Sequence, residues 1–594
     1  MSKTLVLAEK PSVGRELARV LGARKGGNGF LEGEKYIVTW ALGHLVTLAD
    51  PEVYGDEYKK WSFDTLPMLP DKMKLVVIKE TTKQYKTVKE LLLSPNVSDV
   101  IIATDAGREG ELVARWILEK AGCKKPLRRL WISSQTDKAI REGFAHLRDG
   151  KEYVPLCNAA KARAEADWLV GLNVTRALTC RHNAQLSAGR VQTPTLAIIV
   201  ERENEIRHFV PKDYFNLHAA FDGFRALYRN ADGVSALPER AAAEKLAQAV
   251  NGQNFTVSDV KSTEKRTPVP MLYDLTELQR DANKLFKMSP KETLSVMQRL
   301  YEVHKALTYP RTDSRYITED IVPTLYDRVR AASVGMLADT AKDILRSRRT
   351  ICKLCVNNEK VSDHHAIIPT EEMPDMIKFS NEEKRIYVLV VSRFFACFYP
   401  DFVYKQVKAE LSCKDHRFFV SGKEIVDYGW KKLGITDSDE EEEKDESEAE
   451  GGLPALKKGD VLRCRGVEIK ALKTAPPSRY TEASLLSAME NPSKFIKDRR
   501  MKEFIGGGLG TPATRADIIE KLYNTFYIEK KDNVIYPTSK GIQLIGIVPT
   551  ELKEPLLTAK WEMELEKIAK GEAQKDGFLN EIRGYAKELV STVK

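Results

Sequence analysis

A tyrosine, an arginine and an aspartate follow one another at two-residue spacing in the segment 308–314, as Tyr309, Arg311 and Asp313. Pro310 fixes its own φ and disfavours helix at the residue before it, so Tyr309 is expected in an extended or turn segment. A phenol held this way can act as a nucleophile where a cation neutralises the attacked group, and an arginine fork fits phosphate oxygens. The segment therefore indicates attack on a phosphodiester, although a packed tyrosine beside a surface Arg–Asp pair would have the same spacing.

Three acidic residues follow two short apolar runs near the N-terminus. Glu9 comes after the run 4–8, Asp105 comes after the run 99–103, and Glu109 lies in the first turn of a helix expected from residue 108. Alternating strands and helices predict a parallel sheet, in which ligands sit beyond the carboxyl ends of the strands. Clustered carboxylates suit Mg²⁺, although an acid at a helix N-terminus is also favourable by itself. The pattern predicts one Mg²⁺ held by Glu9, Asp105 and Glu109.

Polar side chains that could contact nucleic acid recur in the rest of the chain. Arginine and glutamine can bond phosphates or base edges, and the amides at a helix start can bind a phosphate. Thr511 and Pro512 predict such a helix start just before Arg515. The residues predicted to bind DNA are Arg163, Asp167, Arg190, Gln192 and Arg515.

Two adjacent histidines, His364 and His365, stand in a loop-like segment. Such a pair suggests a metal ligand or a phosphate contact, while an ordinary hydrogen-bonded loop histidine is the alternative. The glycine-rich run at 506–510 is not followed by the lysine of a phosphate-binding loop, so ATP hydrolysis by that route is not indicated.

The chain has 594 residues and a net charge of +9. The stretch 437–450 is strongly acidic and is expected to form a surface loop, so the remainder is more basic than the net charge suggests and suits a polyanion. No apolar run approaches the roughly 20 residues of a membrane helix. Eight scattered cysteines, with one C-x-x-C at Cys352 and Cys355, predict thiols in a reducing cytoplasm and no structural zinc site.

Composition and periodicity predict α/β structure at 1–150, helices at 151–210, at 455–594 and at 271–400 around Tyr309, and β-rich segments at 211–270 and 401–454.

Several of these segments resemble the type IA DNA topoisomerases, in the order in which that family has them. Residues 309–314 match its active-site signature of tyrosine, any residue, Arg-Thr-Asp-Ser, and the string 186–196 resembles a diagnostic segment that lines its single-strand groove. The acids near the N-terminus resemble the Toprim domain, except that Gly107 stands at the second aspartate position, which favours one metal ion over two. The resemblance implies a multidomain torus with an N-terminal Toprim domain, nearest to the topoisomerase III branch. It also implies that 151–210 and 455–594 form one discontinuous helical domain and that 211–270 and 401–454 form one β-rich arch.

The resemblance also implies a role for each catalytic candidate. Tyr309 would be the nucleophile and Arg311 would position the scissile phosphate. Lys10 would contact that phosphate, and Glu9 would handle the proton of the leaving 3′ oxygen. His364 would aid cleavage, while His365 has no assigned role.

The implied activity is ATP-independent strand cleavage through a 5′-phosphotyrosine, strand passage and resealing, which relaxes negative supercoils or decatenates DNA. Expected partners are single-stranded and negatively supercoiled DNA, a RecQ-like helicase and a single-strand binding protein. A monomer without a membrane anchor, located in the cytoplasm with the nucleoid, is expected. The alternatives are a Toprim nuclease or primase, which would not need Tyr309, and a single-strand binding protein without catalytic activity.

Overall fold

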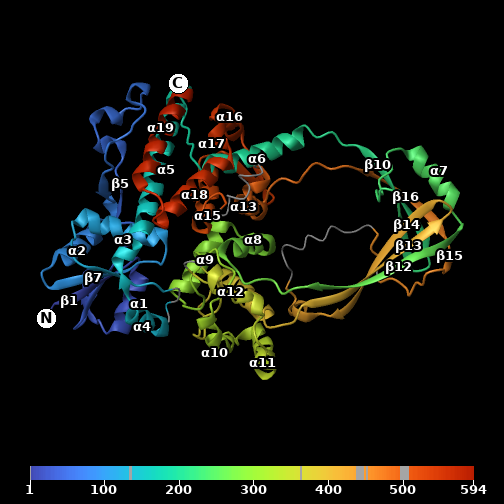
Figure 1. Cartoon of the computed structure of the whole chain (residues 1–594), viewed down its shortest axis with the longest axis horizontal. Helices are drawn as coiled ribbons and strands as arrows, with labels where there is room; N and C mark the ends of the chain where they lie inside the picture. The colour runs from blue at the N-terminus through green and yellow to red at the C-terminus, as the bar shows by residue number, and fades with distance from the viewer. Residues whose placement is uncertain are drawn as a thin grey trace.

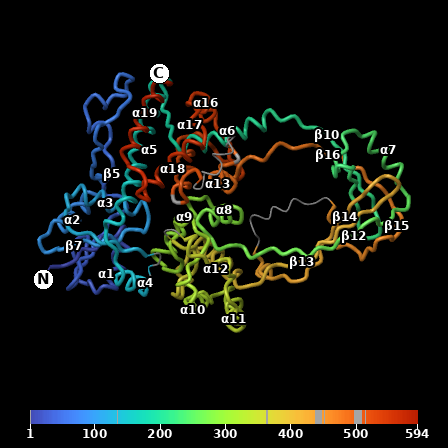
Figure 2. Tube along the Cα trace, viewed as in Figure 1, coloured from blue at the N-terminus to red at the C-terminus, as the bar shows by residue number. Residues whose placement is uncertain are grey.

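The polypeptide forms a ring. An N-terminal α/β domain and two helical domains lie together on one side, and two long arms join them to a β-domain on the other side (Figure 1). The computed structural model describes residues 2–132, 135, 137–361, 364–435, 447–449, 452–495 and 508–593. Most of the predicted acidic loop at 437–450 lies outside these residues. The tube along the Cα trace shows that the chain runs repeatedly between the helical part and the far β-domain (Figure 2).

The N-terminal domain is a mixed sheet with helices on both faces. Its strand order is β2-β3-β4-β1-β7-β8-β9, and β1 lies parallel to both β4 and β7. The strands are β1 Lys3–Ala8, β2 Lys25–Gly27, β3 Phe30–Glu32, β4 Tyr36–Trp40, β7 Val97–Ala103, β8 Leu127–Arg129 and β9 Arg148–Asp149. The helices are α1 Pro11–Leu21, α2 Thr82–Leu93, α3 Arg108–Ala121 and α4 Asp137–Ala145. The predicted α/β pattern, with strands near 4–8 and 99–103 and a helix starting at residue 108, is confirmed.

Two hydrophobic cores cover the two faces of this sheet. Neighbouring residues of β1 pack into different cores, because successive side chains of a strand point to opposite faces. Leu5 and Leu7 pack with α2 and α3, while Val6 and Ala8 pack with α1 and α4. Both faces of the strand are therefore apolar, and the polar residues that follow it are left at the sheet edge.

The helical domain combines segments from two distant parts of the chain. Its first long helix packs against two helices near the C-terminus, and one large core joins them. The helices are α5 Val154–His182, α6 Gln192–Arg207, α13 Glu482–Glu490, α15 Pro512–Asn524, α16 Ser539–Ile547, α17 Thr550–Lys553, α18 Pro555–Ala569 and α19 Lys575–Val593. A hairpin of β17 Ile528–Lys531 and β18 Val534–Pro537 also belongs to it. Thr511 is the N-cap of α15 and Pro512 its first residue, as predicted.

The segment 271–400, called here the tyrosine domain, is helical as predicted and has its own core. Two of its helices begin with capping boxes, in which Ser289 and Ser380 bond to the backbone three residues on. Its helices are α8 Leu275–Phe286, α9 Pro290–Glu302, α10 Leu325–Ala331, α11 Ala338–Arg346 and α12 Asn381–Ala396.

The arch at the far end of the ring is an antiparallel sheet of order β15-β12-β13-β14-β11-β10-β16 with one helix, α7 Arg240–Val250. The strands are β10 Asp213–Phe221, β11 Phe224–Arg229, β12 Asn254–Thr267, β13 Phe402–Cys413, β14 His416–Asp427, β15 Val461–Arg463 and β16 Gly466–Lys473. The sheet thus extends past the expected boundary at residue 454. Strands β15 and β16, expected in the helical part, instead pair with β12 and β10.

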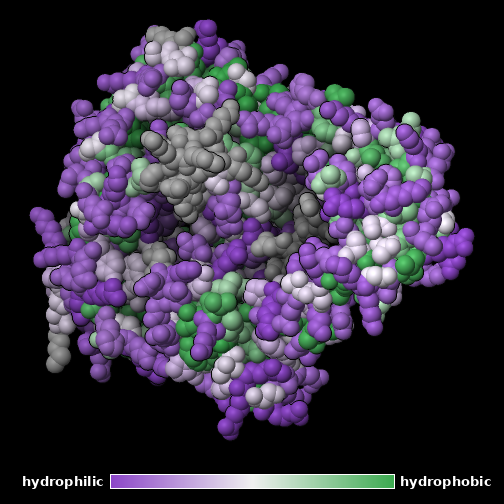
Figure 3. All heavy atoms as spheres, turned by 45° about the vertical axis from the view of Figure 1, so that its right-hand side comes forward, coloured by the Kyte–Doolittle hydropathy of each residue, from purple (hydrophilic) through white to green (hydrophobic). Residues whose placement is uncertain are grey.

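The space-filling view shows a hollow between the bodies and the arch, and hydrophilic side chains make up most of the surface around it (Figure 3). The tyrosine domain lies beside the N-terminal and helical domains, so Tyr309 and the carboxyl ends of β1 and β7 can meet across a domain boundary.

Candidate active site

The segment that carries Tyr309 is extended and pinned on both sides. The amide of Thr308 donates to the carbonyl of Ile368 (3.0 Å), and the amide of Ile368 donates to Oγ1 of Thr308 (3.0 Å). Oγ1 of Thr312 donates to the carbonyl of His364 (2.9 Å). The prediction of a non-helical tyrosine is confirmed, and these bonds explain why the histidine segment lies beside the tyrosine.

The phenol of Tyr309 reaches across the boundary to the N-terminal domain. Its hydroxyl donates to Oδ2 of Asp105 at 2.7 Å, and only 8% of the residue is exposed. The ring stacks on His364 at 4.1 Å between centroids and meets Tyr301 edge-on at 5.4 Å. Burial and the charges of Asp105 and Glu9 raise the pKa of Tyr309 well above 10, and Arg311 opposes them. The closed structure therefore keeps the proton on Tyr309, instead of providing the cationic surroundings expected to favour its loss.

Glu9 and Asp105 lie next to each other where β1 and β7 end, as predicted for a shared site. The amide of Asp105 donates to Oε2 of Glu9 at 3.1 Å. Burial and the charge of Asp105 raise the pKa of Glu9 from 4.5 to about 7, against the opposing effects of Lys10 and Arg311. A carboxyl group with such a pKa carries its proton at neutral pH for a large part of the time, as a general acid requires.

A buried arginine that the sequence analysis missed supports the Asp105 loop. The guanidinium of Arg129 is fully buried and donates to the carbonyls of Asp105 (2.6 Å) and Thr104 (2.8 Å). Its charge is balanced by Glu111 at 3.0 Å. A Cβ at Gly110 would lie 2.1 Å from the carbonyl oxygen of Asp105, so only glycine fits there. The sequence alone reveals neither the role of Arg129 nor the need for glycine at position 110. Arg129 follows Arg128, and two adjacent arginines are typical of a protein surface.

Both predicted cations lie close enough to Glu9 to lower its pKa. Lys10 precedes α1, and its Nζ lies 2.7 Å from Oε1 of Glu302 at the end of α9. Arg311 is exposed and close enough to lower the pKa values of both Glu9 and Tyr309. The structure thus brings together Tyr309, Glu9, Lys10 and Arg311, with Glu302 as an unpredicted member.

His364 is a buried neutral ring at this site. Burial, with smaller contributions from His365 and Arg129, lowers the pKa of His364 to about 3. Burial likewise lowers the pKa of His365 to about 4, and its Nδ1 lies 2.7 Å from the carbonyl oxygen of Ala366. At neutral pH neither ring serves as a cation, so the contribution open to His364 is orientation of the tyrosine through the stacked rings.

Two of the three predicted metal ligands are suitably placed for Mg²⁺. Glu9 and Asp105 form a half-buried pair whose mutual repulsion contributes to the raised pKa of Glu9, and a cation would relieve that repulsion. Glu109 instead faces Arg163, with its Oε1 3.5 Å from Nη1, and is more than half exposed. In the part of the chain that the structure describes, no three acidic, histidine or cysteine residues form a metal-holding group. Mg²⁺ commonly uses one or two carboxylates and retains waters, so the Glu9–Asp105 pair fits it.

A second charged group lies where α3, α5 and α18 meet. Arg190 is buried, with its Nε 3.0 Å from Asp167 and its Nη1 3.1 Å from Glu562. Arg108 also binds Glu562, and Arg163 lies near Asp167. Burial alone would lower the pKa of Arg190, but its two carboxylate partners outweigh it and raise the pKa. We call Arg108, Glu109, Arg163, Asp167, Arg190 and Glu562 the groove network.

The other two predicted DNA contacts are buried. Gln192 opens α6 and lies within 3.5 Å of Ser187. Arg515 donates from Nη1 to Oγ1 of Thr276 (2.8 Å), and burial lowers its pKa. In this arrangement neither residue presents its polar atoms to the solvent as a DNA contact would.

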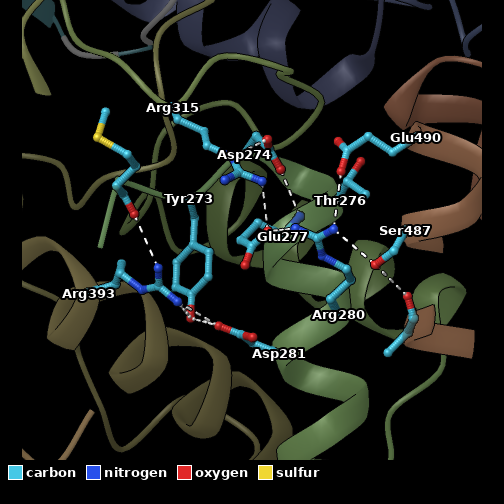
Figure 4. Close-up of polar contacts among 12 residues, drawn as sticks. Tyr273, Asp274, Thr276, Glu277, Arg280, Asp281, Arg315, Arg393, Ser487 and Glu490 are labelled. Carbon is cyan, nitrogen blue, oxygen red and sulfur yellow. Dashed lines mark hydrogen bonds and ion pairs between the residues drawn. The ribbon is translucent and has the colours of Figure 1, made fainter. Parts of the chain in front are cut away.

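Arg515 belongs to a charged interface between the tyrosine domain and the helical domain. Figure 4 shows its centre, where Arg280 reaches from α8 to Ser487 and Glu490 of α13. Arg315, six residues beyond Tyr309, binds Asp274 (2.9 Å), the N-cap of α8, and Glu277 (2.7 Å) on α8. The segment that carries the tyrosine is therefore tied to this interface as well as to the N-terminal domain.

Two expectations concern features outside the site. All eight cysteines are free thiols. Among the described residues, none of the helices combines the length and apolar character needed to cross a membrane.

Comparison with known proteins found matching families for the N-terminal domain and for the rest of the chain. The Toprim domain family matches residues 4–135, and a DNA topoisomerase family matches residues 151–580. DNA topoisomerase 3 of Bacillus licheniformis is 53% identical over 601 residues, covering 100% of this chain and 82% of the relative. DNA topoisomerase 3 of Bacillus subtilis is 51% identical over 599 residues with the same coverage. The structure of full-length topoisomerase I from Thermotoga maritima has a TM-score of 0.74 at 23% identity, covering 99% of this chain and 90% of that one, which supports the fold.

Proposed function

The chain belongs to the type IA DNA topoisomerase family, and we propose that it changes DNA topology by cutting one strand, passing another through the break and resealing it without ATP. The observation that carries this proposal is the 2.7 Å hydrogen bond from Tyr309 to Asp105 across the boundary between two domains. A nucleophile and its proton acceptor on separate domains allow a cut DNA strand to be held by one domain and released by the other.

Cleavage begins when a phosphate of single-stranded DNA lies between Lys10 and Arg311. The phenol oxygen of Tyr309 attacks phosphorus, its proton passes to Asp105, and the bond from phosphorus to the 3′ oxygen breaks. Glu9, which has a pKa of about 7, gives its proton to the leaving 3′ oxygen. The two cations stabilise the charge that develops on the phosphate oxygens.

Tyr309 needs a proton acceptor before it can attack the phosphate. The pKa of Tyr309 is raised mainly by burial and by the nearby carboxylates, so attack requires a proton acceptor in contact with the hydroxyl. Asp105 meets that requirement in the closed structure. The product is a 5′-phosphotyrosine, which keeps the energy of the broken bond, and reversal of the same proton transfers reseals the strand.

The divalent ion is proposed to bind at Glu9 and Asp105. When bound, Mg²⁺ would neutralise these carboxylates and help to hold the broken ends. Glu109 joins the ligand set only if it leaves Arg163, so we assign it a secondary role.

Single-stranded DNA is proposed to follow the helical domain toward Tyr309, guided by the groove network and by Gln192. Arg163 and Arg190 keep their charges in the network, and incoming phosphates would compete with Asp167 and Glu562 for them. A contact by Arg515 requires the α8–α13 interface to loosen, because Arg515 is buried there.

The identity with the two Bacillus relatives supports action on DNA, and a location in the cytoplasm near the nucleoid stays a prediction. Relaxation of negative supercoils and decatenation are both compatible with the ring. A monomeric state, a RecQ-like helicase partner and a single-strand binding protein partner stay predictions.

The deciding experiment is covalent trapping. The protein is incubated with 3′-labelled single-stranded DNA and Mg²⁺, denatured with detergent, and separated to find label that migrates with protein. We expect labelled protein from the wild type and from Tyr326→Phe, a phenol elsewhere in the tyrosine domain that bonds to Arg349, and none from Tyr309→Phe. Free cleaved DNA that persists in Tyr309→Phe would instead support a Toprim nuclease.

A further inference from the structure

Lys10 has a carboxylate partner in a place where the proposed reaction needs a phosphate. Its Nζ lies 2.7 Å from Oε1 of Glu302, which also accepts from Nε2 of Gln298 at 2.6 Å. The pair joins residues 292 positions apart and crosses from the N-terminal domain to the tyrosine domain. We propose that Glu302 is a placeholder for the DNA phosphate: it holds Lys10 while the enzyme is empty, and a bound phosphate displaces it.

Both members of this pair stand at the unfavourable ends of their helices. Lys10 is the N-cap of α1 and makes no side-chain capping bond, although a helix N-terminus disfavours a cation. Glu302 is the last residue of α9, where the helix dipole disfavours an anion. Helix formation therefore does not explain either residue, and each is compensated by the other across the domain boundary.

A second ion pair of opposite polarity crosses the same boundary. Nζ of Lys305 in the tyrosine domain lies 2.5 Å from Oε2 of Glu16 on α1. Lys305 has a φ of 52°, a left-handed conformation that lysine seldom adopts, so its backbone is strained in the closed state. Glu16 is also held by Arg19. The two pairs differ in that only Lys10–Glu302 contains a group proposed to bind DNA.

In this proposal two anions, the carboxylate of Glu302 and a DNA phosphate, compete for one cation, Lys10. While Glu302 holds Lys10, two ion pairs between described residues, Lys10–Glu302 and Glu16–Lys305, cross the boundary in addition to the tyrosine bond. When a phosphate takes Lys10, the carboxylate of Glu302 is released and one of these links is lost. DNA binding thereby loosens the boundary that must open for strand passage.

This inference rests on the proposed function, because it takes Lys10 as a phosphate ligand. Its test measures binding of a fluorescein-labelled single-stranded oligonucleotide by anisotropy, in a Tyr309→Phe background that prevents cleavage. Glu302→Gln is compared there with Lys10→Ala and with the two changes combined. Glu302→Ala serves as a second variant without an amide that could still bond to Lys10.

We expect Glu302→Gln to tighten binding by about two- to five-fold, the range for loss of one partly exposed competing ion pair. In the Lys10→Ala background the same change should alter affinity by less than about two-fold. If Glu302→Gln tightened binding equally with Lys10 and with Lys10→Ala, general charge repulsion would explain the effect and the proposal would be wrong. Unchanged or weaker DNA binding in Glu302→Gln would also overturn the proposal.

The matched control is Asp339→Asn, which removes one negative charge from the same domain at an exposed site on α11. It should leave affinity unchanged within about two-fold. Covalent trapping of the wild type is run in parallel. Label on Tyr309 with no effect of Glu302 would reject the placeholder while the topoisomerase activity stands, whereas absence of label would reject the proposed function itself.

Discussion

The tyrosine site and the groove network each surround one buried side chain, Tyr309 or Arg190, with charged groups, but the two sites offset the cost of burying charge in opposite ways. At the tyrosine site burial dominates, since the pKa of Glu9 rises to about 7 and that of His364 falls to about 3. In the groove network pairing dominates: the pKa of Arg190 is raised and that of Glu562 is lowered, so both groups stay ionised.

The difference follows from which partners are present. Each arginine of the groove network has a carboxylate partner within 4.0 Å in the same structure. The carboxylates at the tyrosine site face each other and a phenol, and Lys10 is engaged by Glu302. The network is therefore complete as folded, whereas the tyrosine site lacks charges that a phosphate and a metal ion would supply.

The sharpest test of the tyrosine site is Glu9→Gln, which keeps the shape and removes the acid. We expect the rate of adduct formation to fall by about 100- to 1,000-fold, the usual worth of general acid catalysis. Single-turnover cleavage of labelled single-stranded DNA measures it. In the wild type the rate should decline as pH rises through about 7, where Glu9 loses its proton, and the variant should show no such decline.

Breaking the groove network should cost stability in addition to binding. Arg190→Ala leaves Asp167 and Glu562 without their shared cation, and we expect a loss of about 3 kcal/mol in the free energy of unfolding. Chemical denaturation followed by tryptophan fluorescence measures it. Arg240→Ala, which removes an exposed arginine from α7, should change the same quantity little, and equal losses in the two variants would contradict the comparison.

Protonation of Glu9 should link stability to pH. Because its pKa in the folded state is raised to about 7 from 4.5, the folded protein binds the proton more tightly than the unfolded chain. The resulting stabilisation is fully present below about pH 4.5 and is lost as pH rises through about 7. We expect the wild type to lose about 3 kcal/mol more than Glu9→Gln between these limits. Parallel slopes for the two proteins would show that folding leaves the pKa of Glu9 unchanged.

The smallest effect is expected at His364. Because its ring is neutral and stacks on Tyr309, His364→Gln should slow cleavage by about ten-fold through misorientation of the phenol. The shape of the pH profile between about pH 5 and 9 should not change, since the pKa of His364 lies near 3. A lost inflection in the variant would show that His364 transfers a proton.

Local signals in the sequence were sufficient for the elements that position the carboxylates. The short apolar run 4–8 predicts β1, the helix start at Arg108 is confirmed, and Thr511 with Pro512 predicts the first turn of α15. These features depend on neighbouring residues, whose caps and periodicity are readable along the chain.

Other features depend on residues brought together only by the fold. Glu302 has no local sign of its role, because Lys10 is 292 residues away. Arg129 becomes a support for Asp105 only when β8 pairs with β7. The pairing of β16 with β10 joins segments about 250 residues apart, which is why residues 466–473 were expected in the helical part.

The paired arms of the ring have a mechanical consequence. One arm is the ribbon of β12, β13 and β14, and in the other the amide of Lys212 donates to Thr474 (2.9 Å) while Arg479 binds Glu203 (2.8 Å). Each arm thus consists of segments bonded side by side, three strands in the first arm and two segments in the second. A single proteolytic nick at the turn after Cys413 would leave the three strands of the first arm bonded to one another. The nicked protein should migrate as two fragments under denaturing conditions while remaining one closed particle in native solution.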